Sequence, residues 1–171
     1  SSPSSSHTGK HIEEAIYPLI MPDGSILPHA ETATMLLGAS PKLAAKKADA
    51  IVKTLGFPNP YTLSKHLAED LVAELHTQGR LNACIVRPSI VGANAGGPAP
   101  GYFGNTAGAT SMILAFASGM ATFSCHDPDN VFDLVPCDVV AAAVLGAAAG
   151  VAAGGSPCGP GTQPMIVHAA S

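Results

Sequence analysis

The sequence has little charge and few aromatic side chains. Charged residues make up 12% of its 171 residues and aromatic residues 5%, and tryptophan is missing. No run of Lys and Arg interleaved with aromatics occurs, and the formal net charge is −4. Because nucleic-acid binding needs a basic surface to neutralise phosphates, we do not expect a nucleic acid as partner.

Cysteine is also sparse and is not arranged for metal binding. The four cysteines, Cys84, Cys125, Cys137 and Cys158, are widely spaced and form no CxxC or Cys/His pattern of the kind that binds zinc. No basic segment followed by a short apolar run opens the chain, so no signal peptide is expected. These absences predict an intracellular, reducing compartment and no metal site.

Long apolar runs are missing as well, although hydrophobic residues make up 47% of the chain. The run 139–153 is rich in Ala, Val and Gly and is shorter than the ~20 residues that a membrane span needs, so we interpret it as a buried helix. The Ser-rich residues 1–11 predict a flexible lead-in. Residues 12–171 are long enough for one domain, or for part of one.

Several helices and strands are predicted from local patterns. A helix is expected to start at Pro41, with Ser40 as its N-cap, and to end at Gly56. A second is expected at about residues 61–76, ended by Gly79, and a third near 111–121. The Pro- and Gly-containing stretch 11–32 is expected to cross the surface in turns.

The strands that follow the helix at 61–76 suggest the fold class. The run 81–93, "LNACIVRPSIVGA", is typical of a strand buried on both faces of a parallel sheet. Residues 130–150 predict a short strand, a turn at Pro136 and an Ala-rich helix capped by Asp138, and "PMIVHAAS" predicts a last strand. Since helix followed by parallel strand is half of a βαβ unit, we predict an α/β fold.

The stretch "NPYTLSKHLAEDLVAEL" places Tyr61 and Lys65 four residues apart at the head of the predicted helix. Residues four apart share a helix face, so the two side chains can reach the same small volume. A phenol titrates near ~10 and is a poor acid at neutral pH unless a positive charge stabilises the phenolate. An ammonium does this, and its other N–H groups can bind a sugar hydroxyl.

The bare YxxxK spacing is a weak signal, because it has a chance of roughly one in ten of arising somewhere in such a chain. The order of elements around it is more specific. The segments "YTLSKHLAEDLV", "ACIVRPSIVGA", "PGYFGNTAGA" and "VFDLVPCDVVAAAVLGAA" resemble, in this order, the fatty acyl-CoA reductases, which are extended short-chain dehydrogenases/reductases with a male-sterility-type NAD(P)-binding domain. The resemblance covers about residues 12–171.

This resemblance implies a Rossmann-like, doubly wound parallel sheet and NADPH-dependent reduction of a long-chain acyl-CoA to the aldehyde or alcohol. It implies that Tyr61 donates a proton to the carbonyl oxygen, while Lys65 stabilises the phenolate and binds the nicotinamide ribose. The segment formed by Pro88, Ser89, Ile90 and Val91 would pass along the nicotinamide. Substrate contacts could come from Tyr102, Phe103 and Asn105, although these residues could equally pack their own loop.

Two features of the family have no counterpart in the sequence. The Gly-rich phosphate loop should follow a first strand and open a helix, whereas "GANAGGPAPG" follows a late strand. The Ser or Thr that accompanies the catalytic tyrosine would lie upstream of Ser1. We therefore expect residues 12–171 to be the carboxyl part of a reductase domain whose N-terminal half is missing. Two alternatives stay open: another extended short-chain reductase or epimerase, and an inactive fragment that only packs against a partner.

Overall fold

The computed structural model describes residues 13–105, 108–123, 127, 129, 131–154 and 161–170. The Ser-rich lead-in, Cys125 and Cys158 lie outside these residues. The chain divides into two compact units. The first unit comprises Ser1–Ile85 and Ser156–Ile166, and the second comprises Val86–Gly155 and Val167–Ser171.

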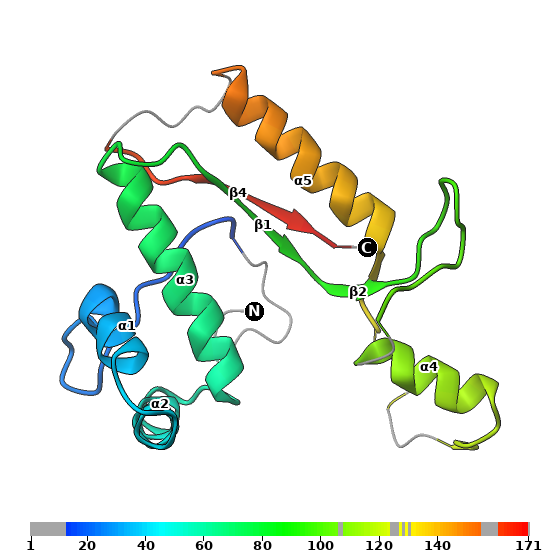
Figure 1. Ribbon diagram of the computed structural model, residues 1–171, viewed down its shortest axis with the longest axis horizontal. Helices are drawn as coiled ribbons and strands as arrows, with labels where there is room; N and C mark the ends of the chain where they lie inside the picture. Colours follow the sequence, from blue (N-terminus) through cyan, green and yellow to red (C-terminus); the bar gives the residue numbers. More distant parts are fainter. Residues whose placement is uncertain are drawn as a thin grey trace. The chain divides into compact units, whose positions relative to one another are not determined.

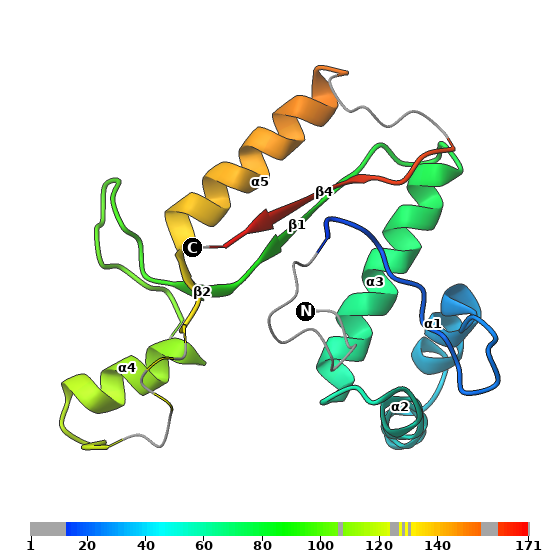
Figure 2. The same cartoon turned by 180° about the vertical axis from the view of Figure 1, so that it is seen from behind.

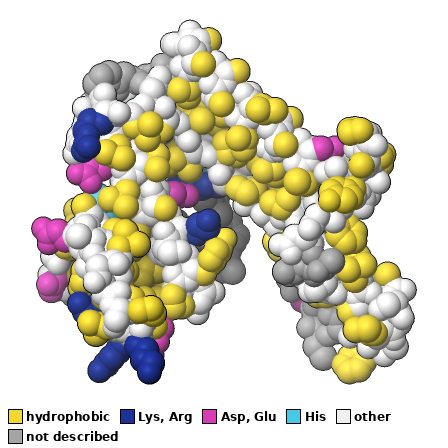
Figure 3. Space-filling view, in the orientation of Figure 1, with side chains coloured by type: hydrophobic (Ala, Val, Ile, Leu, Met, Phe, Trp, Pro, Cys, Tyr) yellow, Lys and Arg dark blue, Asp and Glu magenta, His cyan; other side chains and the backbone are white. Residues whose placement is uncertain are grey.

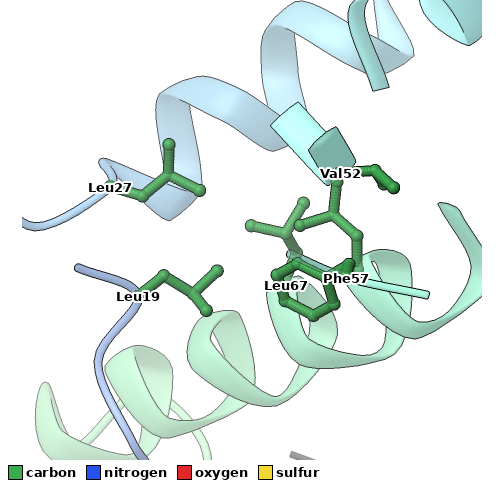
Figure 4. Close-up of a cluster of buried hydrophobic side chains, with 6 residues drawn as sticks. Leu19, Leu27, Val52, Phe57 and Leu67 are labelled. Atoms are coloured by element: carbon green, nitrogen blue, oxygen red, sulfur yellow. The ribbon is translucent and has the colours of Figure 1, made fainter. Parts of the chain in front are cut away.

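Three helices form most of the first unit, as Figure 1 shows. These are α1 (His29–Leu37), α2 (Pro41–Leu55) and α3 (Pro60–Thr77), and each contacts the other two. Their shared core contains six buried apolar side chains, five of which are labelled in Figure 4: Leu19, Leu27, Val52, Phe57, Leu63 and Leu67. The core therefore fixes α3 against the other two helices.

The predicted bounds of α2 and α3 are close to the observed ones, because both helices carry local start and stop signals. Pro41 is the first residue of α2, and Gly56 ends it with a φ of 71°, in the left-handed region that favours glycine. The α3 helix starts at Pro60, one residue before the predicted position. Ser40 precedes α2 in extended conformation, but its side chain makes no capping hydrogen bond.

The stretch 11–32 was wrongly predicted to cross the surface in turns only. Leu19 and Leu27 are 6% and 7% exposed and belong to the core, and α1 begins at His29, directly after Pro28. The helix was missed because Pro28 stands at its N-cap without a capping side chain, so the usual start signal is absent.

The second unit contains a pair of parallel strands, β2 (Ile90–Gly92) and β3 (Leu134–Pro136), with Ile90 opposite Leu134 and Gly92 opposite Pro136. Helices α4 (Ala109–Ala117) and α5 (Cys137–Ala152) contact these strands. Strands β1 (Cys84–Pro88) and β4 (Met165–Ala169) pair and run in the same direction (Figures 1 and 2). Parallel strands alternating with helices give the partial Rossmann-like α/β fold predicted.

Burial in the second unit is lower than predicted. Strand 81–93 is divided at Ser89 into β1 and β2, and Ile90 and Val91 are each more than 40% exposed rather than buried on both faces. Helix α5 is also mostly exposed, with Leu145 at 71% and Ala147 as its one buried residue; hydrophobic side chains cover this part of the surface in Figure 3. Two-stranded sheets are too small to cover these faces. Among the described residues, no helix has the length and apolar character to cross a membrane.

Candidate active site

The first turn of α3 is fixed by its own sequence. The Asn59 side chain accepts a hydrogen bond from the Thr62 N–H at 2.9 Å, and the Thr62 hydroxyl donates to the Asn59 carbonyl at 2.8 Å. Pro60 occupies the first helical position, where no N–H is needed. This cap sets the orientation of Tyr61, which lies between the two bonded residues.

The structure brings Tyr61 and Lys65 together. The Lys65 Nζ lies 5.4 Å from the centroid of the Tyr61 ring, within the range of a cation–π contact. Leu63, between them in sequence, is 1% exposed and packs in the core, whereas Tyr61 is 67% exposed and Lys65 is also exposed. The apolar face of α3 is therefore buried while the phenol and the ammonium share an accessible face.

Histidines elsewhere on α3 hold the fold together. The buried His66 ring bonds the Tyr17 carbonyl at 2.9 Å and lies 3.6 Å from the Asp70 carboxylate. The buried His76 accepts a hydrogen bond from the Ala83 N–H at its Nδ1, at 3.1 Å. Within the described ranges, no group of three or more His, Cys, Asp or Glu side chains could hold a metal ion.

Burial raises the pKa of Asp70, and the neighbouring His66 and His29 partly oppose this shift. His29 itself bonds the Glu74 carboxylate at 2.9 Å and so ties α1 to α3. We assign these polar groups to the structure of the first unit and not to its chemistry.

In the second unit, a cavity of about 410 Å³ joins the end of β2 to the loop 93–105. Val91 lies in its wall together with the three residues predicted to contact substrate, Tyr102, Phe103 and Asn105. Its volume is within the ~300–1,000 Å³ of small-molecule sites. The structure thus places four of the predicted residues around one cavity, and Pro88, Ser89 and Ile90 precede it along the chain without lining it.

Ser89 occupies the break between β1 and β2. Its N–H donates to the Ala169 carbonyl at 3.0 Å, while its Oγ is buried and has no hydrogen-bond partner among the residues the structure describes. A buried hydroxyl without a partner is costly, and it is often a group that a ligand satisfies.

Sequence reasoning missed several residues of this cavity and misassigned one beside it. Asn94, Thr110 and Cys137 line the cavity without having been predicted to do so. Asp138 was predicted to cap α5, but Pro136 holds the N-cap position and Asp138 lies in the first turn. Its carboxylate instead accepts hydrogen bonds from the N–H groups of Ala95 and Gly96, and these bonds lower its pKa below the ordinary 3.8. The available signal was that Asp138 is the one charged residue in the apolar stretch 134–152.

Comparison with known proteins identifies the family. A family model described as male sterility protein, an NAD-binding domain, matches residues 1–144. The chain belongs to the fatty acyl-CoA reductase family. Fatty acyl-CoA reductase 1 from Gallus gallus is 35% identical over 141 residues, and fatty acyl-CoA reductase 2 from Mus musculus is 34% identical over 132. The human fatty acyl-CoA reductase 1 is 33% identical over 141 residues.

These matches cover 81%, 76% and 81% of this chain, respectively, but only 25%, 23% and 25% of the relatives. The chain therefore spans about a quarter of the length of the reductases it resembles. No solved structure matches it.

Proposed function

We propose that the protein reduces long-chain acyl-CoA thioesters to the aldehyde or alcohol, with NADPH as the reductant and Tyr61 as the proton donor. The observation that carries the proposal is the placement of the Lys65 ammonium 5.4 Å from the Tyr61 ring, on an exposed helix face, in a chain of the fatty acyl-CoA reductase family.

The chemistry assigned to this pair is a proton transfer. Reduction of the thioester carbonyl leaves negative charge on its oxygen, and the Tyr61 hydroxyl donates the proton that neutralises it. The hemithioacetal that results then breaks its C–S bond, which releases CoA as the thiol and leaves the aldehyde. The Lys65 ammonium stabilises the phenolate that remains. Because Leu63 anchors the same helical turn in the core, the backbone at Tyr61 is held in place.

Each unit, taken by itself, has groups of the kind that bind a nicotinamide dinucleotide. When bound, this cofactor supplies the hydride. The exposed Lys65 of the first unit has N–H donors suited to a ribose hydroxyl. In the second unit, the Ser89 Oγ has no hydrogen-bond partner within the described part of the chain and offers a hydrogen bond of the kind a carboxamide takes. Pro88, Ile90 and Val91 complete the segment proposed to run along it, and the parallel strands β2 and β3 support a site at their carboxyl ends.

The substrate proposal uses the cavity of the second unit. Tyr102 and Phe103 offer apolar surface to an acyl chain, and Asn105 offers a polar group near the thioester end. Both aromatic residues come from one loop, so the loop conformation determines the shape of the wall they form.

We also propose that the reductase domain extends beyond these residues and that residues 12–171 are its carboxyl part. Exposed apolar side chains on β2 and α5, among them Ile90, Val139 and Leu145, support this, since a larger sheet and its helices would cover them. The proposed location is intracellular and reducing, on the ground that the four cysteines are few and widely spaced in the sequence.

The test uses the protein expressed from its complete gene, with NADPH consumption measured in the presence of palmitoyl-CoA. Tyr61→Phe keeps the ring and removes the hydroxyl, and it should lower kcat by about 100-fold or more. Tyr17→Phe is the matched control. His66 bonds the backbone carbonyl of Tyr17, which this change leaves in place, so the variant should keep full activity.

A Tyr61→Phe enzyme with the wild-type rate would disprove the role of the phenol. Activity with a sugar nucleotide in place of palmitoyl-CoA would favour the reductase or epimerase alternative, and failure to bind NADPH would favour an inactive protein. Parallel assays with NADH decide the cofactor preference.

A further inference from the structure

We infer that Asp138 is a positioning residue: its carboxylate holds the loop 93–105 in the conformation that shapes the cavity wall, and it thereby sets the affinity for the acyl substrate. This inference rests on the proposed function. Asp138 is not among the residues that line the cavity, so it acts through the loop.

The contact between Asp138 and the loop uses both carboxylate oxygens. The Ala95 N–H donates to Oδ1 at 3.0 Å, and the Gly96 N–H donates to Oδ2 at 2.9 Å. Two consecutive amides are thus fixed by one side chain that is more than 40 residues away in sequence. A bond to a charged acceptor is stronger than a neutral one, so this is a strong fixed point for a loop with no regular structure.

Hydrogen bonds within the loop connect the two fixed amides to residues that line the cavity. The Asn94 N–H donates to the Tyr102 carbonyl at 3.0 Å, and the Gly101 N–H donates to the Asn94 carbonyl at 2.8 Å. Asn94 is next to Ala95 in sequence and itself lines the cavity, as do Tyr102 and Phe103. Displacement of residues 95 and 96 would therefore move Asn94, the segment 101–102 that is bonded to it, and the aromatic side chains near the end of the loop.

An ionised aspartate is the side chain this contact requires. The two N–H groups hold the pKa of Asp138 below its ordinary value, so both oxygens accept at neutral pH. An asparagine would offer one acceptor oxygen and turn its NH₂ group toward the other amide, which also donates. An alanine would lose both bonds.

The experiment compares Asp138→Ala and Asp138→Asn with wild type in the protein expressed from its complete gene, with palmitoyl-CoA and NADPH as substrates. For Asp138→Ala we expect the KM for palmitoyl-CoA to rise about tenfold while kcat and the KM for NADPH change by less than about twofold. Asp138→Asn should give an intermediate rise in the same KM.

The matched control is Asp23→Ala in the first unit. Asp23 is a carboxylate that, like Asp138, bonds a backbone N–H, and it also bonds a side chain; both groups belong to Ser25. Its loss should leave all kinetic constants unchanged. A general loss of stability in the Asp138 variants would lower the active fraction and thus kcat, but not raise one KM selectively. Active Asp138→Ala protein with an unchanged KM for palmitoyl-CoA would overturn the inference.

Failure of the proposed function gives a different result, in which wild type consumes no NADPH with palmitoyl-CoA. Amide hydrogen exchange then decides whether Asp138 positions the loop. Faster exchange at Ala95, Gly96 and Asn94 in Asp138→Ala, with no change in Asp23→Ala, supports the positioning role. Unchanged exchange at these amides overturns it.

Discussion

Gly92 is the position where the structure makes the sharpest prediction about stability. A Cβ added there would lie 2.8 Å from Leu134 Cδ2 and 2.9 Å from Leu134 Cγ, whereas ordinary van der Waals contacts begin at 3.4 Å. Because Cγ is the branch point of the side chain, rotation of a methyl group cannot relieve the overlap. Gly92→Ala should therefore destabilise the protein by about 1–3 kcal/mol, the usual cost of overpacking.

Urea unfolding checks this through the free energy of unfolding, with Gly96→Ala as the control. A Cβ at Gly96 would meet its nearest atom, Asp138 Oδ2, at 3.7 Å, so this substitution should change stability by less than about 0.5 kcal/mol. Leu134→Ala removes the clashing atoms, and the double variant should recover about 1 kcal/mol relative to the sum of the single variants. Equal stability of Gly92→Ala and wild type, or strict additivity in the double variant, would refute the reasoning.

Two further predictions concern the first unit. Asn59→Ala removes the side chain that accepts from the Thr62 N–H, and it should lower the free energy of unfolding in urea by about 0.5–2 kcal/mol. Ser40→Ala is the control, because the Ser40 side chain makes no capping bond, and it should be close to neutral. Equal losses of stability in the two variants would contradict the capping role of Asn59. Burial raises the folded-state pKa of Asp70 above the ordinary 3.8, so stability falls as pH rises from 3.8 through that raised value, and the full cost of the buried charge is present above it. Asp70→Asn should raise Tm at pH 7 by on the order of 2 °C and have less effect at pH 3; a lower Tm at pH 7 would show that the ion pair with His66 outweighs the burial.

The parts of the fold predicted well are those determined by neighbouring residues. Pro41 and Gly56 mark the ends of α2, and the spacing of Tyr61 and Lys65 on α3 was enough to place them on one face. Each of these signals acts within one or two helical turns. Start and stop residues and the helical repeat are therefore sufficient, and no knowledge of distant packing is required.

Burial was predicted less well because it depends on what packs against a segment. The Ala-rich run at α5 has the composition of a buried helix, yet Leu145 is 71% exposed, since the elements that contact α5 most in the described residues are two short strands. The opposite error occurred at Leu19 and Leu27, which lie in a Pro- and Gly-containing stretch but complete the core. Apolar composition shows that a segment can be buried, and the neighbouring elements decide whether it is.

The contact of Asp138 with the loop 93–105 depends on topology, and the topology could have predicted it. Strands β2 and β3 are parallel, with Gly92 opposite Pro136, so the segments that follow the two strands leave the sheet at the same edge. The residues that follow β2 must then lie near those that begin α5. Backbone N–H groups of an irregular loop need acceptors, and Asp138 is the one carboxylate in the stretch 134–152. Register and charge together assign Asp138 to the loop, where its position near the start of a helix had suggested a cap.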